Sequence, residues 1–275
     1  MSSYIIARPT DVIAMRSKGL LSILTYSEKR KDILFLLADG PRTLSDIKEY
    51  FKVSSPEIFP RLKEMESSNM ISKDDKIYSI TPIGKAILKH YTPFLDILST
   101  IEKNETFWKE HMLDDIPETL LENLSDLLDC EVVADSIENI YESHKLFKEN
   151  IGKSSVLKGV SSIFIPSYPD FFVELVNNNV RTSLILTENV FFKVVTEHRE
   201  KIEIYLNSPD SELYIIEDVR LAFVVTDQFF SMSLFFSNGS YDPRHDMVGH
   251  DASAIKWGND LFEHYRKLSR RVTSI

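Results

Sequence analysis

The sequence has a single cysteine, Cys130, among its 275 residues. One thiol cannot form a disulfide or a cysteine-based zinc site within the chain, so the sequence favours a protein of a reducing compartment. A long apolar run is missing as well, because Arg8, Asp11, Arg16 and Lys18 interrupt the N-terminal stretch where a signal peptide would need one. These absences predict a cytoplasmic protein with no membrane partner.

Sequence motifs of common enzyme classes are also absent. The eight glycines never form a phosphate-binding loop of the P-loop or dinucleotide type, and there is no Gly-x-Ser-x-Gly nucleophile motif. None of the seven histidines is followed two positions later by lysine, the pair that a phospholipase-D-like enzyme needs. We therefore predict no catalytic residue, no cofactor and no metal.

Charge is present but unevenly distributed. The net charge of −10 argues at first against nucleic acid, since binding to DNA depends on neutralising phosphates with Lys and Arg. Residues 1–93, however, hold 15 Lys and Arg against 11 Asp and Glu, a net charge of +4, whereas residues 94–275 hold 17 against 31, a net charge of −14. The acidity therefore belongs to the second part of the chain.

The first third shows the pattern of a winged helix-turn-helix. Apolar spacing predicts a helix at 27–38, Thr43 and Asp46 form a loose capping box for a second helix, and a third helix follows a short break and Pro56. Two short strands, at 70–72 and 76–80 around a turn at 73–75, predict a β-hairpin that would be the wing. Helical periodicity then continues from Pro82 to Ile101.

This order places the third helix in the major groove of DNA and the hairpin on the backbone. A hydroxyl group can bind a phosphate or a base edge, arginine can bind guanine through two parallel hydrogen bonds, and lysine binds phosphates. The candidate DNA-binding residues are Ser54, Ser55, Arg61, Lys63, Lys73 and Lys76. The alternative is a three-helix unit with solvated basic residues that serves protein contacts.

Beyond Met112 the pattern changes to short strands among helices, which predicts a mixed sheet flanked by helices. The predicted helices lie near 117–129, 137–149, 169–178, 188–205 and 251–271. The predicted strands lie at 131–134, 156–165, 180–186, 213–217, 221–226 and 229–236. The fold class is thus α+β with two domains: a winged helix-turn-helix at 1–93, a linking helix at 94–114 and an α/β domain at 115–275.

One polar cluster, at 241–251, stands out in the second domain. Tyr241, Arg244 and His245 are candidate ligand-binding residues, because arginine could hold an anionic effector and His with Asp could bind a divalent ion. The spacing fits no standard zinc motif. A solvated loop after a hairpin, with Asp251 capping the last helix, explains the same residues.

Residues 26–85 resemble the DNA-binding domain of archaeal ArsR-like winged-helix regulators, and segments 159–176, 221–242 and 254–267 resemble the FilR-type methanogenesis-regulator domain. The resemblance implies a transcription regulator of archaeal, methanogen origin whose second domain senses a signal or mediates assembly. That domain also loosely resembles the phospholipase-D-like sensor domains of archaeal sugar-responsive regulators. The clustered Cys ligands of ArsR-type metal sensors are missing, so metal sensing is not implied.

These observations predict a homodimer that binds double-stranded DNA and responds to an unidentified small-molecule effector. Two copies are expected because a domain of only +4 binds DNA weakly as a monomer. Two alternatives remain open: an adaptor that docks a protein of the transcription machinery, and a metal- or anion-dependent enzyme built on the cluster at 241–251.

Overall fold

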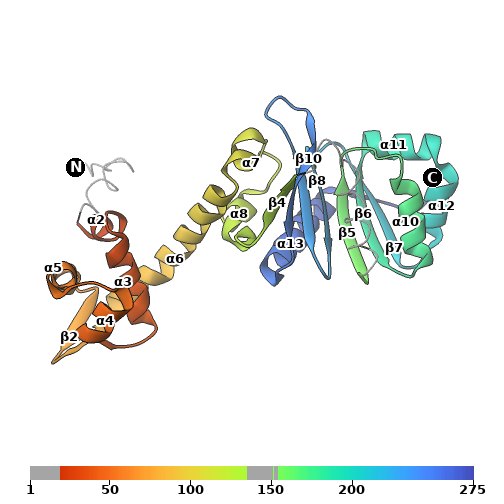
Figure 1. The fold of residues 1–275 in the computed structure, drawn as a ribbon. Coiled ribbons are helices and arrows are strands. Elements are labelled where there is room, and N and C mark those ends of the chain that lie inside the picture. Colours follow the sequence, from red (N-terminus) through yellow and green to blue (C-terminus); the bar gives the residue numbers. More distant parts are fainter. Residues whose placement is uncertain (1–18, 135–150, 152–153) are drawn as a thin grey trace, which may run out of the picture. The chain divides into compact units, whose positions relative to one another are not determined.

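The computed structural model describes residues 19–134, 151 and 154–275. The chain divides into two compact units, Met1–Leu95 and Asp96–Ile275, and helix α6 (Pro82–Lys103) contributes residues to both (Figure 1). The helix predicted at 137–149 lies outside the described residues. Among those described, no helix combines the length and the apolar character needed to cross a membrane.

The first unit contains short helices and a three-stranded antiparallel sheet in the order β1-β3-β2. Its elements are α2 (Leu20–Thr25), α3 (Glu28–Ala38), β1 (Arg42–Thr43), α4 (Leu44–Phe51), α5 (Ser55–Ser67), β2 (Ile71–Asp74), β3 (Ile77–Ile80) and the start of α6. Three helices followed by a β-hairpin is the winged helix-turn-helix order that the sequence predicts.

Local sequence explains where these helices begin. The Ser27 side chain accepts a hydrogen bond from the Arg30 N–H at the start of α3, and Thr43 and Asp46 form the full capping box of α4. Fully buried apolar side chains join α3, α4 and α5 in one core: Ile33, Leu34, Ile47, Ile58, Leu62 and Met65. The hairpin turn lies at Asp75-Lys76, later than predicted, because Asp74 already pairs with Ile77 and Asp75 supplies the left-handed φ of 50°.

The second unit is built on an eight-stranded mixed sheet. Its helices are α7 (Glu105–Glu110), α8 (Glu118–Leu121), the 3-10 turn η1 (Leu124–Leu127), α10 (Tyr168–Asn177), α11 (Glu188–Glu197), α12 (Arg199–Asn207) and α13 (Ala252–Leu268). Its strands are β4 (Glu131–Ala134), β5 (Val156–Ser161), β6 (Arg181–Thr187), β7 (Ser211–Ile216), β8 (Leu221–Thr226), β9 (Phe230–Phe235), β10 (Tyr241–Gly249) and β11 (Arg270–Val272).

The strand order is β11-β7-β6-β5-β8-β9-β10-β4 (Figure 1). β5, β6 and β7 are mutually parallel, and the other neighbours pair antiparallel. Alternate residues of β5, β6, β7 and β8 enter two separate cores, as the period of two requires. One core contains α13 with Phe223, Met232 and Met247, and the other contains residues of α10, α11 and α12 with Leu184 and Leu186.

Several predicted elements differ from the structure. The predicted helix at 188–205 is two helices, which meet at His198. The predicted helix at 117–129 is the short α8 followed by η1. The interpretation of 241–251 as a solvated loop was wrong for most of its length, because β10 pairs with both β9 and β4 and buries Asp242, Met247 and Gly249. Asp251 does cap α13, as predicted.

Candidate nucleic-acid interface

The start of α5 follows from local backbone conformation. α4 ends at Lys52, which has a left-handed φ of 53°, and Ser54 is extended at the N-cap position of α5. The Ser54 side chain makes no capping hydrogen bond, and Pro56 lies in the first turn, where its missing N–H costs nothing. Ser54 is exposed, while Ser55 is half-buried.

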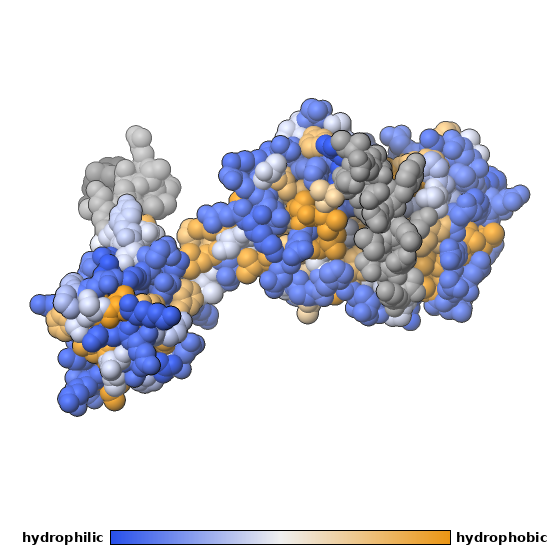
Figure 2. Space-filling view, in the orientation of Figure 1, coloured by the Kyte–Doolittle hydropathy of each residue, from blue (hydrophilic) through white to orange (hydrophobic). Residues whose placement is uncertain are grey.

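The two faces of α5 differ in chemistry. Ile58, Leu62 and Met65 are fully buried and hold the helix against the core of the unit. The outer face exposes Pro56, Phe59, Pro60 and Lys63, and Phe59 retains 47% of its surface. The surface of this unit in Figure 2 is mainly hydrophilic, with small hydrophobic areas. The exposed face of α5 thus carries apolar side chains beside the predicted DNA-binding residue Lys63.

Two acidic residues of α5 are paired with cations of α3. Lys29 Nζ forms an ion pair with Glu57, and Arg30 Nη2 lies 3.0 Å from Glu64 Oε2. Arg61 donates from Nη1 to the carbonyl oxygen of Glu57 in its own helix. The pairs reduce the repulsion that free carboxylates on this helix would exert on a phosphate backbone, but they also occupy basic side chains of α3.

The β2–β3 hairpin presents two exposed lysines. Lys73 lies over the ring of Tyr78, with Nζ 5.6 Å from the centroid, and Lys76 is in the turn. Both lysines, with Phe59 of α5 and the first residues of α4, line an open groove of about 420 Å³. The two ammonium groups favour an anionic occupant of such a groove.

The structure therefore brings together some of the predicted residues. Lys73 and Lys76 share one groove, and Lys63 is exposed on α5. The guanidinium of Arg61 bonds to the carbonyl oxygen of Glu57, so it would have to turn outward to reach a base. Sequence analysis missed Phe59 as a groove residue, because a single aromatic residue in a helix has no signal that separates exposure from burial.

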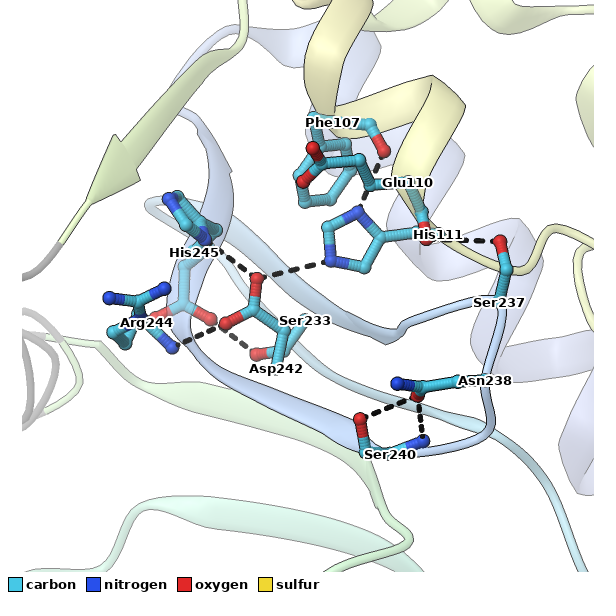
Figure 3. Close-up of polar contacts among 11 residues, drawn as sticks. Phe107, Glu110, His111, Ser233, Ser237, Asn238, Ser240, Asp242, Arg244 and His245 are labelled. Atoms are coloured by element: carbon cyan, nitrogen blue, oxygen red, sulfur yellow. Dashed lines mark hydrogen bonds and ion pairs between the residues drawn. The ribbon is translucent and has the colours of Figure 1, made fainter.

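A second polar cluster lies in the other unit, around Asp242 (Figure 3). Asp242 is 0% exposed; its Oδ1 accepts from the Arg244 N–H at 2.9 Å, and its Oδ2 lies 3.1 Å from His111 Nε2 and 2.6 Å from His245 Nδ1. Burial by itself would raise the pKa of Asp242, but the hydrogen bonds from Arg244, His245 and His111 hold it below its ordinary value. The Phe107 carbonyl can only accept, so His111 Nδ1 donates to it, and His111 can also donate to Asp242 only when both of its ring nitrogens carry a proton.

The three predicted ligand residues separate in the structure. Tyr241 lines a cavity together with Ser233 and Asp246, whereas the Arg244 side chain is exposed and His245 contacts Asp242. Within the described ranges no group of three or more His, Cys, Asp or Glu side chains is placed to hold a metal ion. Asp242 lay within the predicted cluster, but its partner His111 is 131 residues away and could not be paired with it from spacing.

Two family models match the chain. Residues 18–99 match the N-terminal domain of the methanogenesis regulatory protein FilR1, and residues 140–268 match its middle domain. A curated FilR1 protein of Methanothrix harundinacea is 24% identical over 257 residues, which are 92% of this chain and 58% of that protein. The chain is thus similar to a methanogenesis regulatory protein in two separate stretches, and the ArsR-like label stays a prediction.

The chain spans only 58% of the length of that FilR1 relative, so the partners and signals of the whole relative are proposals for this chain. Solved structures with distant likeness include TrmBL2, an archaeal chromatin protein, at 16% identity and a TM-score of 0.43 over 94% of this chain and 100% of that one. YodB of B. subtilis is 25% identical over 32% of this chain and 92% of its own, with a TM-score of 0.26. At these TM-scores neither likeness bears on fold or function.

Proposed function

We propose that the chain is a DNA-binding transcription regulator in which α5 enters the major groove and the β2–β3 hairpin contacts the backbone. The observation that carries the proposal is the groove with Lys73 and Lys76 beside α5 in a unit of winged-helix order. The match to the FilR1 N-terminal domain supports it. The likeness to a methanogenesis regulatory protein also favours a binding protein over an enzyme.

Charge sets the expected mode of binding. Residues 1–93 have a net charge of +4, so one copy can neutralise only a few phosphates. A homodimer would place two such units on two half-sites and combine their contacts. Residues 94–275, which include the second unit, have a net charge of −14. This unit would change the geometry of the dimer when a signal binds. Such a signal must bind the two geometries with different affinity to have any effect.

A gel shift of the full-length protein with a pool of genomic fragments at increasing salt tests the proposal. Loss of Arg61 and Lys63 in the double variant Arg61→Ala/Lys63→Ala should weaken binding at least tenfold, since each contact to a base or phosphate contributes about 1–3 kcal/mol. The matched control Lys267→Ala/Arg270→Ala removes the same charges from exposed positions in the second unit and should bind like the wild type. Wild-type protein that never binds DNA in a salt-sensitive way would exclude this function.

One observation favours a second candidate, a protein-interaction adaptor. Phe59 and Tyr50 are exposed, at 47% and 65% of their surface, on the two helices of the helix-turn-helix. Exposed aromatic side chains are typical anchors of protein interfaces. In that case Phe59→Ala would abolish capture of a transcription-machinery protein, and the Lys63 substitution would have little effect on that capture.

A further inference from the structure

We propose that Phe59 of α5 selects thymine in the DNA target by packing its ring against the 5-methyl group of that base in the major groove. This contact rests on the proposed function, because α5 must lie in the groove for Phe59 to reach a base. It adds to that function the base that is recognised and the side chain that recognises it. Phe59 retains 47% of its surface, so its ring is accessible to a partner.

One flank of α5 faces α3, and its polar groups already have partners. Glu57 forms an ion pair with Lys29 of α3. Glu64 pairs with Arg30 of α3 at 3.0 Å. The Arg61 guanidinium bonds to a carbonyl oxygen of its own helix. Any of these groups would have to give up a contact within the protein before it could bind a base edge.

The opposite flank of α5 is directed toward the β2–β3 hairpin. Phe59 lines the open groove of about 420 Å³ together with Lys73, Lys76 and Tyr78. Lys63 follows Phe59 by four positions, so the two exposed side chains share one face of the helix. An apolar ring therefore lies beside ammonium groups, which favour an anionic partner.

DNA offers both groups that this surface matches. Its phosphates pair with ammonium groups along the backbone. In the major groove the base edges present hydrogen-bond donors and acceptors, and thymine adds a methyl group that the other three bases lack. Apolar contact with a side chain such as phenylalanine is one way in which proteins recognise this methyl group. An exposed phenyl ring on the helix in the groove therefore favours thymine.

Phe59 is the side chain of α5 best suited to this contact. The structure describes every residue of α5, and Phe59 is the one large hydrophobic side chain of this helix that is exposed. Pro56 and Pro60 are smaller, and although both are exposed, neither is among the described residues that line the groove. Ser54 and Lys63 are exposed as well, and they can donate hydrogen bonds to phosphates or base edges.

The test uses the full-length protein and the DNA duplex that it selects from a random-sequence pool. Each thymine of this duplex is replaced in turn by deoxyuridine, which removes only the methyl group, and affinity is measured by fluorescence anisotropy. At one position in a half-site the replacement should weaken binding by the wild type about fourfold, which corresponds to about 0.8 kcal/mol for one buried methyl group. A duplex with no position that responds in this way would overturn the proposal.

Variants assign the thymine preference to a side chain. Phe59→Ala should bind the thymine and deoxyuridine duplexes alike, whereas Phe59→Leu keeps an apolar side chain and should keep the preference. Phe192→Ala makes the same change at a position of α11 that is 74% exposed, and it should leave the preference at full size. If Phe59 had only a structural role, Phe59→Ala would weaken binding to both duplexes equally and retain the preference, and that result would overturn the proposal.

A crosslink tests the contact in the wild type and decides the matter if Phe59→Ala does not fold. Iododeoxyuridine carries iodine in place of the methyl group, and irradiation of the complex should join the base at the sensitive position to Phe59. A crosslink to another residue, or none, would overturn the proposal.

The same measurements separate this contact from the proposed function. Salt-sensitive binding of DNA with no effect of deoxyuridine would reject the thymine contact alone, whereas a wild type that binds no DNA would reject both. In the second case, capture of a protein that Phe59→Ala abolishes would make Phe59 an anchor of a protein interface instead.

Discussion

Asp242 is a carboxylate with no exposed surface, and three groups lie within hydrogen-bond distance of its oxygens: the Arg244 N–H, His245 and His111. Asp242→Asn keeps the shape but removes the charge and turns one acceptor into a donor. We expect the free energy of unfolding to fall by about 2–4 kcal/mol, since a buried donor is left without its partner. Urea denaturation at pH 7 measures it, and Asp218→Asn at an exposed site is the control.

The same carboxylate predicts a pH dependence. The pKa of Asp242 is lower in the folded state than its ordinary value, so its contribution to stability is complete above the unfolded pKa of about 4. That contribution is lost as the pH falls through the lower folded pKa. Urea midpoints recorded from pH 7 down to pH 3 should therefore decline more steeply in the wild type than in Asp242→Asn. If the urea midpoints of the two proteins decline in parallel, a group other than Asp242 governs the loss of stability at low pH.

Helix α13 gives a prediction in which packing opposes helix propensity. Replacing a glycine inside a helix by alanine normally stabilises it by about 1 kcal/mol. At Gly258, however, a Cβ would lie 2.4 Å from Phe230 Cδ2 and 3.1 Å from Val225 Cβ, so the helix would have to move away from β8 and β9. Gly258→Ala should thus lower the free energy of unfolding by about 1–3 kcal/mol.

Thermal or urea denaturation tests whether Gly258→Ala lowers the free energy of unfolding. Lys267→Ala, on the exposed last turn of the same helix, should change stability by no more than about 0.5 kcal/mol. A gain in stability for Gly258→Ala would mean that α13 does not pack as closely on the sheet as the structure has it.

The whole chain is predicted to be a dimer, and α6 offers the exposed apolar surface for it. Ile83, Phe94 and Leu98 of this helix are exposed by 46%, 50% and 38%. Phe94→Asp should shift the sedimentation profile of the full-length protein towards the monomer and weaken DNA binding at least tenfold, because one of two half-site contacts is lost. Phe192→Asp, at a residue that is 74% exposed on α11, is the matched control. A monomeric wild type at micromolar concentration would rule out the dimer.

The sequence by itself determined what depends on near neighbours. The caps at Thr43 and Asp251 and the period of the apolar residues were predicted correctly, because each rests on residues within a few positions of one another. The winged-helix order followed from these signals. The uneven distribution of charge along the chain followed from counting the charged residues.

Only the tertiary structure decided what joins distant parts of the chain. It paired His111 with Asp242, and it turned the segment at 241–249 from an expected loop into a strand between β9 and β4. It also set small residues of β5, β8 and β9 side by side to leave a cavity, and it tied Lys29 and Arg30 to carboxylates of α5. Strand register and helix–helix contacts depend on residues that are far apart in the sequence. The free energy of the whole fold determines them, so no local sequence pattern predicts them.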